Sequence, residues 1–477
     1  MRNTITFLMD GNPVEIDFSR EKSVRPTTTL LNYLRSFSSH RGVKEGCAEG
    51  DCGACTVAIA EPSGDGALRY RAVDSCLVFL PMIDGKQLIT VENLRSPAGT
   101  LHPVQDAMVE HHGSQCGFCT PGFIMSMFVL FKGPAAPSRS EIEDALTGNL
   151  CRCTGYRPIV DAAEAACARG PVDHFSATER NVLSTLASFP RGSIEIRTPG
   201  QMYFRPDSLD EACSALRKFP GAFVIAGGTD VALRVTKRHE LLGTVIDLGA
   251  VPELKRVYAS AEGLQIGAGV PIADLPPLLE GKYPALAGTL SLFASRQIRN
   301  LATFGGNLGT ASPVGDTPPV LIASGASVIL QSVRGAREIP LDGFFTGYRE
   351  TLREPDELIL SLHIPPPDGA LVRSYKVSKR RDLDIATLSA GFRLSVAAGG
   401  NVESLTLAYG GMAERTRRAV KTEQFLIGNA WSRDRVEAAG EYLRQDFSPI
   451  TDVRGSAEFR MLAAKNLLLK FWLDSKG

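Results

Sequence analysis

Three cysteines at C-x4-C-x2-C spacing, Cys47, Cys52 and Cys55, constrain this chain more than any other feature of its sequence. Glycines stand between them, where backbone N–H groups must turn toward the sulfur atoms without a Cβ in the way. The spacing is typical of the plant-type loop that holds a [2Fe–2S] cluster, which needs a fourth thiolate. Cys76 can supply that thiolate, although its apolar neighbours would also suit a buried core cysteine.

The residues around this loop predict a small domain of strands and one helix. Apolar and polar side chains alternate over residues 5–9 and 14–18, on either side of a turn at 10–13, which predicts a β-hairpin. A helix is expected over 27–37, where three leucines share one face, and a strand over 56–60. This order of elements is similar to the β-grasp arrangement of plant-type ferredoxins.

A second group of four cysteines follows as two pairs, Cys116 with Cys119 and Cys151 with Cys153. Four thiolates suit zinc as well as an iron–sulfur cluster. Zinc ribbons and knuckles normally place two to four residues between paired ligands, so the C-x-C pair strains that geometry. The two remaining cysteines, Cys167 and Cys213, fit neither group and are expected to be packing residues.

Helices are expected beside the second group of cysteines. A buried helix is predicted over 123–131 and another over 141–146, with Ser138 or Ser140 as its N-cap. Both cysteine pairs would then lie at helix termini. A helix N-terminus favours negative charge, which suits a cluster that carries four thiolates.

Length and composition narrow the class of protein. At 477 residues the chain should form roughly two to four domains, each with its own core. Its 52 basic and 52 acidic residues give no net charge, which argues against nucleic-acid binding. Ten cysteines are too few for a disulfide scaffold. No segment reads as a signal peptide or membrane span, and free thiolates need a reducing compartment, so we expect a soluble cytoplasmic protein.

Two glycine-containing stretches, 223–230 and 302–310, predict turns whose backbone N–H groups could approach a pyrophosphate. Each stretch by itself is a weak signal. A Rossmann fold is not expected, because the nearest match to G-x-G-x-x-G, at 267–272, lacks its third glycine and has Pro271 where a helix should begin. A dinucleotide would therefore bind on another scaffold.

The motifs Cys-Gly-Phe-Cys-Thr-Pro-Gly at 116–122 and Cys-Arg-Cys-Thr-Gly-Tyr at 151–156, downstream of the loop at 47–55, resemble the xanthine oxidase family of molybdenum hydroxylases. The resemblance implies a multidomain α+β protein. Its expected parts are a β-grasp [2Fe–2S] ferredoxin-like domain (1–85), a four-helix [2Fe–2S] domain (86–167), a linker with one short helix over 177–187 (168–194), an FAD domain of the vanillyl-alcohol-oxidase type (195–370) and a C-terminal α+β domain like that of carbon monoxide dehydrogenase flavoproteins (371–477).

The resemblance also implies which residues bind cofactors. The metal ligands would be Cys47, Cys52, Cys55 and Cys76 in one cluster, and Cys116, Cys119, Cys151 and Cys153 in the other. The FAD contacts would be Val224, Ile225, Ala226, Gly227, Gly228, Thr229, Asp230, Val231, Phe293, Thr303, Phe304, Gly305, Gly306, Asn307, Asp316, Ile359 and Lys376. The loop 379–385 lies where the family places a nicotinamide site, but Leu383 separates two acidic residues that adjoin in animal enzymes, so a solvated charged loop is an equal interpretation.

The implied function is electron transfer. Electrons from the oxidation of hypoxanthine or xanthine to urate would pass from a molybdopterin to the cluster of Cys116, then to the cluster of Cys47, then to FAD and NAD+. The protein would tune cofactor potentials, and we expect no catalytic acid, base or nucleophile in this chain. Whether NAD+ or O2 accepts the electrons stays open.

The chain resembles the small subunit of the split bacterial members of the family, because nothing beyond the flavin region remains to hold a molybdopterin. The implied partner is a molybdopterin-binding large subunit, in a heterotetramer of two small and two large subunits. One alternative keeps this role in a hydroxylase of aldehydes or N-heterocycles. A remote alternative is a scaffold that holds zinc in four-thiolate sites.

Overall fold

The computed structural model describes residues 1–133 and 136–476, in which the chain divides into two compact units. The first unit contains Met1–Ser208, Gly221–Ala250 and Ser295–Ala302. The second contains Leu209–Pro220, Val251–Ala294 and the chain from Thr303 onward. Both units are therefore built from segments that are discontinuous in sequence, and each is described separately.

A five-stranded sheet of order β2-β1-β5-β3-β4 opens the first unit. Its strands are β1 (Thr4–Met9), β2 (Asn12–Asp17), β3 (Thr56–Pro62), β4 (Leu68–Asp74) and β5 (Gln87–Ile89). The predicted hairpin is confirmed: β1 pairs antiparallel with β2, while β5 runs parallel to β1. The predicted helix also forms as α1 (Leu30–Arg35), but shorter than expected, because Thr29 caps it by accepting a hydrogen bond from Asn32 N–H. Short 3-10 turns complete this β-grasp part: η1 (Ser38–His40), η2 (Ser75–Leu77), η3 (Leu80–Ile83) and η4 (Val91–Leu94).

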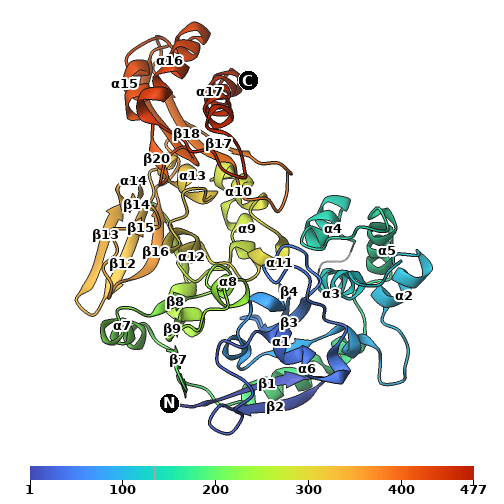
Figure 1. Ribbon diagram of the computed structural model, residues 1–477. Coiled ribbons are helices and arrows are strands. Elements are labelled where there is room, and N and C mark those ends of the chain that lie inside the picture. The colour runs from blue at the N-terminus through green and yellow to red at the C-terminus, as the bar shows by residue number, and fades with distance from the viewer. Residues whose placement is uncertain (134–135, 477) are drawn as a thin grey trace. The chain divides into compact units, whose positions relative to one another are not determined.

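Four helices follow and gather in one group, drawn in light blue to teal in Figure 1: α2 (Pro103–Glu110), α3 (Thr120–Phe131), α4 (Arg139–Leu146) and α5 (Arg157–Ala168). Helix α3 is apolar around most of its circumference, so it forms the centre of this group. Ser138 caps α4 in a capping box with Glu141, as one of the two expected N-caps. The four-helix prediction is confirmed.

The stretch expected to be a linker with a short helix contains a longer one, α6 (His174–Ser188). Asp173 caps α6, and Leu186 and Phe189 are buried against Leu8 and Ala60 of the β-grasp part. The expectation of a short helix over 177–187 was therefore wrong in length. Most of the added residues precede 177, because the Asp173 cap starts the helix at His174.

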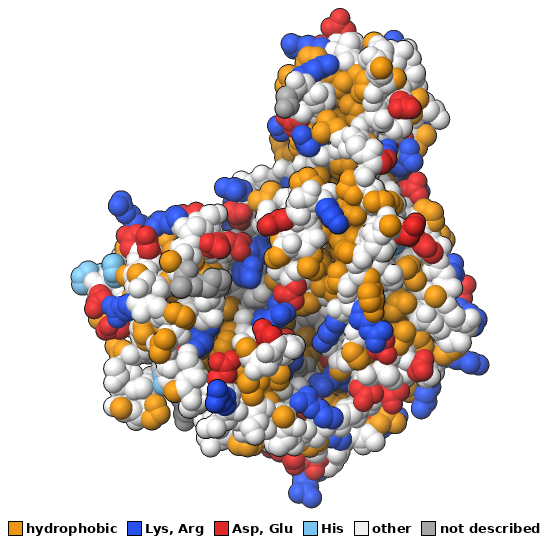
Figure 2. Space-filling view, turned by 180° about the vertical axis from the view of Figure 1, so that it is seen from behind, with side chains coloured by type: hydrophobic (Ala, Val, Ile, Leu, Met, Phe, Trp, Pro, Cys, Tyr) orange, Lys and Arg blue, Asp and Glu red, His pale blue; other side chains and the backbone are white. Residues whose placement is uncertain are grey.

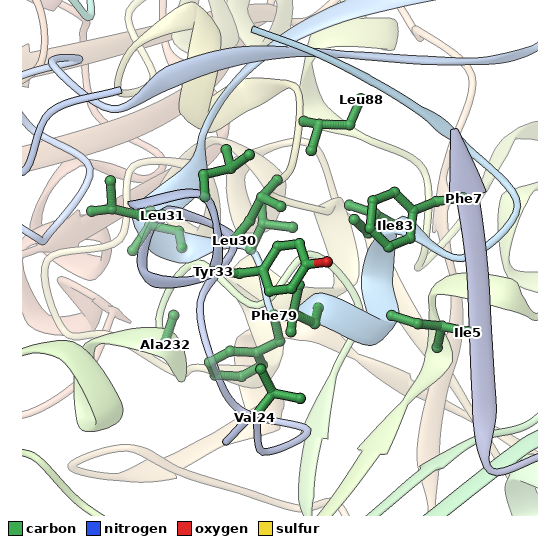
Figure 3. Close-up of a cluster of buried hydrophobic side chains, with 14 of the residues drawn as sticks. Ile5, Phe7, Val24, Leu30, Leu31, Tyr33, Phe79, Ile83, Leu88 and Ala232 are labelled. Carbon is green, nitrogen blue, oxygen red and sulfur yellow. The ribbon is translucent and has the colours of Figure 1, made fainter. Parts of the chain in front are cut away.

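A small four-stranded sheet of order β6-β7-β9-β8 completes the first unit. Its strands are β6 (Ile194–Thr198), β7 (Gln201–Arg205), β8 (Phe223–Ile225) and β9 (Thr244–Asp247), followed by the turn η5 (Leu248–Ala250). Helix α8 (Ala232–Thr236) follows β8, and the short helix α11 (Arg296–Arg299) joins this unit from later in the chain. Figure 3 shows Ala232 of α8 in the same cluster of buried side chains as Leu30, Tyr33 and Phe79 of the β-grasp part.

The second unit contains a five-stranded antiparallel sheet of order β10-β11-β16-β12-β13. The strands are β10 (Val257–Ser260), β11 (Gly263–Gly267), β12 (Ser327–Ser332), β13 (Gly335–Pro340) and β16 (Leu358–Ile364). Its other elements are α7 (Leu209–Lys218), η6 (Pro252–Lys255), η7 (Ile272–Asp274), α9 (Pro276–Leu279), α10 (Pro284–Ser291), α12 (Phe304–Gly309), α13 (Thr317–Ala323), α14 (Leu341–Phe344) and the paired strands β14 (Phe345–Gly347) and β15 (Glu350–Thr351).

The C-terminal part of the second unit is a four-stranded sheet, order β17-β18-β19-β20, with three helices. It comprises β17 (Leu371–Val377), β18 (Leu388–Val396), β19 (Val402–Gly410), β20 (Arg417–Arg418), α15 (Val420–Leu426), α16 (Arg433–Asp446) and α17 (Ala457–Asp474). Figure 1 shows the helices, in red, beside the sheet, and their apolar faces share one core with it. The two strands expected around 392–396 and 405–409 are confirmed as β18 and β19.

Basic and acidic side chains are interspersed over the face shown in Figure 2. This mixture agrees with the equal numbers of basic and acidic residues in the sequence.

Candidate functional site

The loop that carries Cys47, Cys52 and Cys55 turns backbone N–H groups toward its own sulfur atoms. Cys47 Sγ accepts hydrogen bonds from the N–H groups of Glu49 and Asp51 at 3.4 and 3.3 Å, and Cys52 Sγ accepts one from Cys47 N–H at 3.3 Å. The loop reaches this shape through left-handed backbone at Ala48, Gly50 and Gly53, with φ of 55°, 80° and 63°. The inward N–H groups predicted from the glycines are therefore present.

Cys76, at the centre of the turn η2, faces the same loop. Its Sγ lies 3.4 Å from Cys55 Sγ, and both residues are buried. The four thiols thus form two pairs, Cys47 with Cys52 and Cys55 with Cys76. A [2Fe–2S] cluster takes four thiolates on two irons, so a pairwise arrangement of sulfurs fits it.

The thiols of the first group differ in their pKa values. The hydrogen bond from Cys52 and the backbone N–H groups lower the pKa of Cys47 to about 5, although burial opposes this. The hydrogen bond with Cys76 and complete burial raise the pKa of Cys55 well above its ordinary value. A thiol in such surroundings becomes a thiolate only when a nearby cation compensates its negative charge, and bound iron would do this.

Asp74, at the end of β4, is a buried acid beside this group that the sequence did not reveal. Its side chain is fully buried, and its Oδ1 lies 3.7 Å from Cys55 Sγ. Burial and the neighbouring Cys47 raise the pKa of Asp74 well above its ordinary value. A neutral carboxyl is therefore favoured next to these sulfurs.

The second group of thiols also forms two pairs. Cys119 contacts Cys151, and Cys116 contacts Cys153, each through a hydrogen bond between the sulfurs. Burial and Cys151 raise the pKa of Cys119 to about 12. In the described parts of the chain, no three side chains of the His, Cys, Asp and Glu types converge as they would around a single ion, so the thiols occur as pairs in both groups.

The expectation that both cysteine pairs lie at helix termini is correct for one pair only. Cys119 is the N-cap of α3, whereas Cys151 and Cys153 lie in the loop between α4 and α5. Tyr156 explains the difference, because its left-handed backbone (φ 69°) delays the start of α5. Its hydroxyl accepts a hydrogen bond from Cys151 N–H at 3.0 Å, which fixes the loop.

The two cysteine loops contact each other directly. Leu150 N–H, next to Cys151, donates to the carbonyl oxygen of Cys52 at 3.0 Å. Gly53 fits only as glycine, because a Cβ there would overlap with Asn149 and Gly148. One hydrogen bond therefore joins the backbone of the two candidate metal sites.

The two predicted packing cysteines are both buried. Cys167 lies in α5 within the helical core, and Cys213 lies in α7. Burial raises the pKa of each to about 11. Their assignment as packing residues is confirmed.

The first glycine stretch forms the turn after β8 and lies within the first unit. A Cβ on Gly227 would overlap with the carbonyl oxygen of Leu301, so close backbone packing alone requires glycine there. Gly228 has φ of 74°, and a Cβ on it would lie 3.6 Å from the carbonyl oxygen of Leu77, the residue after Cys76. The candidate flavin turn of this unit therefore packs on Leu77, next to a cysteine of the first group.

The second glycine stretch belongs to the second unit and was expected to be a turn. It is instead the short helix α12, capped by Thr303, whose Oγ1 accepts from Gly306 N–H at 3.1 Å. The N–H groups of Phe304 and Gly305 donate to Val270 and Ala268. A Cβ on Gly305 would overlap with Ala268, so packing again requires the glycine. These three N–H groups have protein acceptors in this structure. The expected turn was therefore wrong, and access of N–H groups to a pyrophosphate stays a prediction at this stretch.

Asp316 and Lys376 form a buried ion pair in the second unit. Lys376 Nζ lies 2.8 Å from Asp316 Oδ2 and also donates to the carbonyl oxygen of Leu292 at 2.9 Å, beside Phe293. Burial raises the pKa of Asp316, and Lys376 opposes this. The other oxygen, Oδ1, is buried without a protein partner, so it can accept a hydrogen bond from a bound group. Ile359 is buried in β16.

A cavity of about 720 Å³ lies in the same unit, between α10, α13 and the C-terminal sheet. Lys282, Arg373, Arg393, Asp342 and Asp368 are among its lining residues. None of the residues expected to bind FAD lines it. This cavity is therefore not where the sequence places a flavin.

The charged loop at 379–385 is held by its own side chains. Arg380 pairs with Asp384 at 2.6 Å, and Lys379 donates to the carbonyl oxygen of Val453 at 2.9 Å. Leu383 has left-handed backbone, with φ of 69°. This internal pairing suits the solvated-loop interpretation as well as a nicotinamide contact.

In the part of the chain that the structure describes, no helix combines the length and the apolar character needed to cross a bilayer.

Comparison with protein families covers nearly the whole chain. Residues 14–79 match a 2Fe-2S iron-sulfur cluster binding domain, and residues 90–164 match a [2Fe-2S] binding domain. Residues 195–367 match the FAD binding domain in molybdopterin dehydrogenase, and residues 373–475 match the CO dehydrogenase flavoprotein C-terminal domain. Fold and matches together define an iron–sulfur flavoprotein, with two [2Fe–2S] domains ahead of an FAD-binding domain and a C-terminal flavoprotein domain.

Relatives narrow this class. The chain is 33% identical to xanthine dehydrogenase of Emericella nidulans, over 99% of this chain and 38% of that protein. It is 32% identical to xanthine dehydrogenase/oxidase of Gallus gallus, over 98% and 40%, and 34% identical to xanthine dehydrogenase of Drosophila pseudoobscura, over 98% and 39%. The four matched domains and these relatives correspond to the iron–sulfur and flavin region of the xanthine oxidase family. The chain spans about two fifths of the length of these relatives.

Solved structures share the fold of somewhat more than half of the chain. Carbon monoxide dehydrogenase from Hydrogenophaga pseudoflava, in a form lacking the Mo-pyranopterin moiety, is 29% identical with a TM-score of 0.54, covering 56% of this chain and 94% of that one. Quinoline 2-oxidoreductase from Pseudomonas putida 86 is 27% identical with a TM-score of 0.53, covering 58% and 98%.

Proposed function

We propose that this chain is the electron-transfer part of a xanthine dehydrogenase. It would receive electrons from a molybdopterin-binding partner during oxidation of hypoxanthine or xanthine to urate, and pass them through two [2Fe–2S] clusters and FAD to NAD+. The observation that carries the proposal is a continuous series of contacts in the first unit. Leu150 bonds to Cys52 between the cysteine groups, and Gly228 packs on Leu77 beside Cys76.

The proposed ligands are the eight paired cysteines. Cys47, Cys52, Cys55 and Cys76 would hold the cluster nearer the flavin turn, and Cys116, Cys119, Cys151 and Cys153 the other. When bound, the clusters accept and release single electrons, and the flavin collects two of them. The chain's own residues orient the sulfurs through hydrogen bonds from backbone N–H groups. They also exclude water from the buried pair Cys55 and Cys76. No side chain needs to act as acid, base or nucleophile in this scheme.

We propose the same FAD residues as the sequence analysis, with different roles for some of them. In the second unit, Asp316 and Lys376 offer a buried oxygen and a buried cation, and Ile359 an apolar surface. Thr303 and Asn307 would contribute side chains rather than a turn. In the first unit, residues 224–231 would contribute backbone groups beside Leu77.

The proposed partner is a molybdopterin-binding large subunit, in a heterotetramer of two small and two large subunits. The names of the relatives support the purine substrate, and their greater length supports a further molybdenum part. We propose the cytoplasm as the compartment, because thiolates need reducing surroundings.

Purification from the native source tests the proposal. We expect about four iron atoms and one FAD per chain, a larger molybdenum-containing partner, and reduction of NAD+ with hypoxanthine. Zinc in place of iron, or only two irons, would overturn it. Strong reduction of O2 with no reduction of NAD+ would reject NAD+ as the acceptor while leaving the relay intact.

The second candidate is the same relay in another molybdenum hydroxylase. The structural likeness to quinoline 2-oxidoreductase favours an N-heterocycle as the alternative substrate. Aldehydes, quinoline, nicotinate and hypoxanthine should therefore be assayed side by side with the purified complex. Activity on hypoxanthine alone supports the first candidate, and activity on one of the others alone supports the second.

A further inference from the structure

Asn149 is buried between the two cysteine loops, with 2% of its surface exposed. Its Nδ2 donates to the carbonyl oxygen of Gly53 at 3.0 Å and to Thr56 Oγ1 at 3.1 Å. Its Oδ1 accepts from Ser126 Oγ at 2.6 Å and from Gln297 Nε2 at 3.1 Å. Asn149 therefore links the first cysteine loop, helix α3 and α11.

Gln297 of α11 is fully buried and uses its amide nitrogen three times. Nε2 donates to Ser126 Oγ at 2.8 Å, to Asn149 Oδ1 at 3.1 Å and to the carbonyl oxygen of Ala145 at 3.1 Å. A Cβ on Gly148 would overlap with the Gln297 amide. Two of these contacts, with Ala145 and Asn149, therefore fix the segment that leads into Leu150 and Cys151.

The neighbours of Gln297 on the same segment reach the other candidate sites of the first unit. The Cδ1 atom of Ile298 would lie 2.7 Å from a Cβ placed on Gly50, inside the first cysteine loop. The carbonyl oxygen of Leu301 packs on Gly227 in the candidate flavin turn. Residues 295–302 therefore touch both cysteine loops and that turn.

We propose that Gln297 is a positioning residue for electron transfer between the two clusters. It holds Asn149 and Leu150 so that the hydrogen bond from Leu150 N–H to the Cys52 carbonyl persists. Covalent bonds and this one hydrogen bond then connect Cys151 to Cys52 without interruption, so an electron can pass between them along bonds. One electron leaves the second cluster, which is oxidised, and enters the first, which is reduced; no proton or atom moves. The inference rests on the proposed function.

A buried polar network of this kind specifies one geometry, because each member loses a partner if any other shifts. An apolar residue of similar length at 297 could fill the same volume. Asn149 Oδ1 and the Ala145 carbonyl oxygen would then each lose the hydrogen bond that the Gln297 amide donates. Asn149 would then be held by fewer hydrogen bonds, so Asn149 and Leu150 would be fixed less firmly relative to Cys52. A change at Gln297 should therefore alter the relative position of the two clusters more than the amount of iron that the protein holds.

The test is Gln297→Met in the iron-loaded protein with its flavin, with Gln201→Met as the matched control. Gln201 is also buried, and its Nε2 likewise donates to a hydroxyl, of Thr27, and to a backbone carbonyl, of Leu242. It contacts neither cysteine loop in these bonds. Both substitutions remove a buried amide, but only Gln297→Met removes one that is hydrogen-bonded to the segment between the cysteine loops.

Two readouts separate positioning from folding. After a pulse of one-electron reductant, we expect the transfer rate between the clusters to fall about 10- to 100-fold in Gln297→Met, as for other residues that support metal ligands. The magnetic coupling between the two reduced clusters in their EPR spectra should weaken as well. Gln201→Met should match the wild type in both, and iron should stay at about four per chain.

Wild-type rate and coupling in Gln297→Met would overturn the inference. If that variant fails to fold, Ser126→Ala decides, because it removes one partner of the same network and should slow the transfer in the same direction; a wild-type rate there would also overturn it. A wild-type protein that holds zinc or lacks iron would overturn the proposed function. Four irons in the wild type, together with an unchanged transfer rate and magnetic coupling in Gln297→Met, would overturn this inference and leave the proposed function in place.

Discussion

Gln297 donates its amide to Asn149 across 3.1 Å, although the two residues are 148 positions apart in the sequence. Both side chains are buried, and each also bonds to Ser126. Through this pair, a segment that follows Phe293 in the chain becomes part of the unit that holds both cysteine groups. The arrangement of the candidate electron-transfer sites thus depends on residues outside the cysteine motifs.

Replacing a predicted ligand should remove one cluster and spare the other. We expect Cys119→Ala to lower the iron content from about four to about two per chain, because a [2Fe–2S] cluster needs four ligands. Iron analysis and EPR of the remaining cluster measure this. Cys167→Ala is the control, since Cys167 is buried but lies outside both groups, and it should keep all four irons. Four irons in Cys119→Ala would reject Cys119 as a ligand.

Gly227→Ala should destabilise the first unit, because its Cβ would overlap with the carbonyl oxygen of Leu301. Overpacking against backbone should lower the free energy of unfolding by about 3 kcal/mol or more and reduce the bound flavin. Gly243→Ala is the control, since nothing lies within 4 Å of its Cβ. Denaturant unfolding and the flavin-to-protein ratio measure both variants. Equal stability of the two would show that the turn can move away from Leu301.

Lys376→Met should leave the Asp316 carboxylate buried without its cation. Losing one partner of a buried pair lowers the free energy of unfolding by about 3 kcal/mol at neutral pH. Burial already raises the pKa of Asp316 against the effect of Lys376, so removing the lysine raises it further. An acid with a raised folded-state pKa favours folding below its unfolded value, ordinarily 3.8, and this stability is lost as pH rises through the folded value.

The deficit of Lys376→Met should therefore be larger at pH 8 than at pH 5, as measured by denaturant unfolding at both. Lys470→Met is the control, because Lys470 is exposed and its pair with Asp474 lies at the surface. A deficit that does not change with pH would show that Asp316 is not the group left unpaired.

Asp173→Asn should weaken the helical part at neutral pH. Burial tends to raise the pKa of Asp173, but hydrogen bonds from His102 and Lys132, both at 2.9 Å, outweigh it, so the pKa is lowered. An acid of this kind stabilises the fold above its unfolded pKa, ordinarily 3.8, and the stability is lost as pH falls through the folded value. The free energy of unfolding should drop by about 3 kcal/mol at pH 7.

The difference between wild type and Asp173→Asn should shrink as the pH falls below about 4, because the acid of the unfolded wild type then binds a proton while that of the folded state, with its lower pKa, stays ionised. Unfolding at pH 7 and at pH 3 tests this. Asp161→Asn, on the exposed side of α5, should differ little from wild type at either pH. An equal loss for both variants at pH 7 would contradict the role of the buried network.

The local sequence determined those features that depend on neighbouring residues. The spacing of Cys47, Cys52 and Cys55 requires a loop around sulfurs, and the glycines supply its left-handed backbone. The hairpin β1–β2 follows from alternation and a turn, and the start of α4 from the capping box of Ser138. Such signals act within a few residues, so no tertiary contact is needed to interpret them.

Errors arose where packing overrides local preference. The Gly305-Gly306 stretch disfavours helix by propensity, yet it is helical because Thr303 caps it and its backbone packs on Ala268. Helix α6 begins earlier than expected, at His174, because Asp173 caps it, and His102 and Lys132 hold that side chain in place. In both cases the deciding partner lies far along the chain.

The tertiary structure alone decided how the candidate sites meet. Nothing near Gln297 in the sequence marks it, because its role comes from Ser126, Ala145 and Asn149, which reach it only after folding. The motifs determine which cysteines can bind iron, since ligation is a matter of residue type and spacing. The relation between the two groups depends on buried hydrogen bonds between distant segments, which no local pattern encodes.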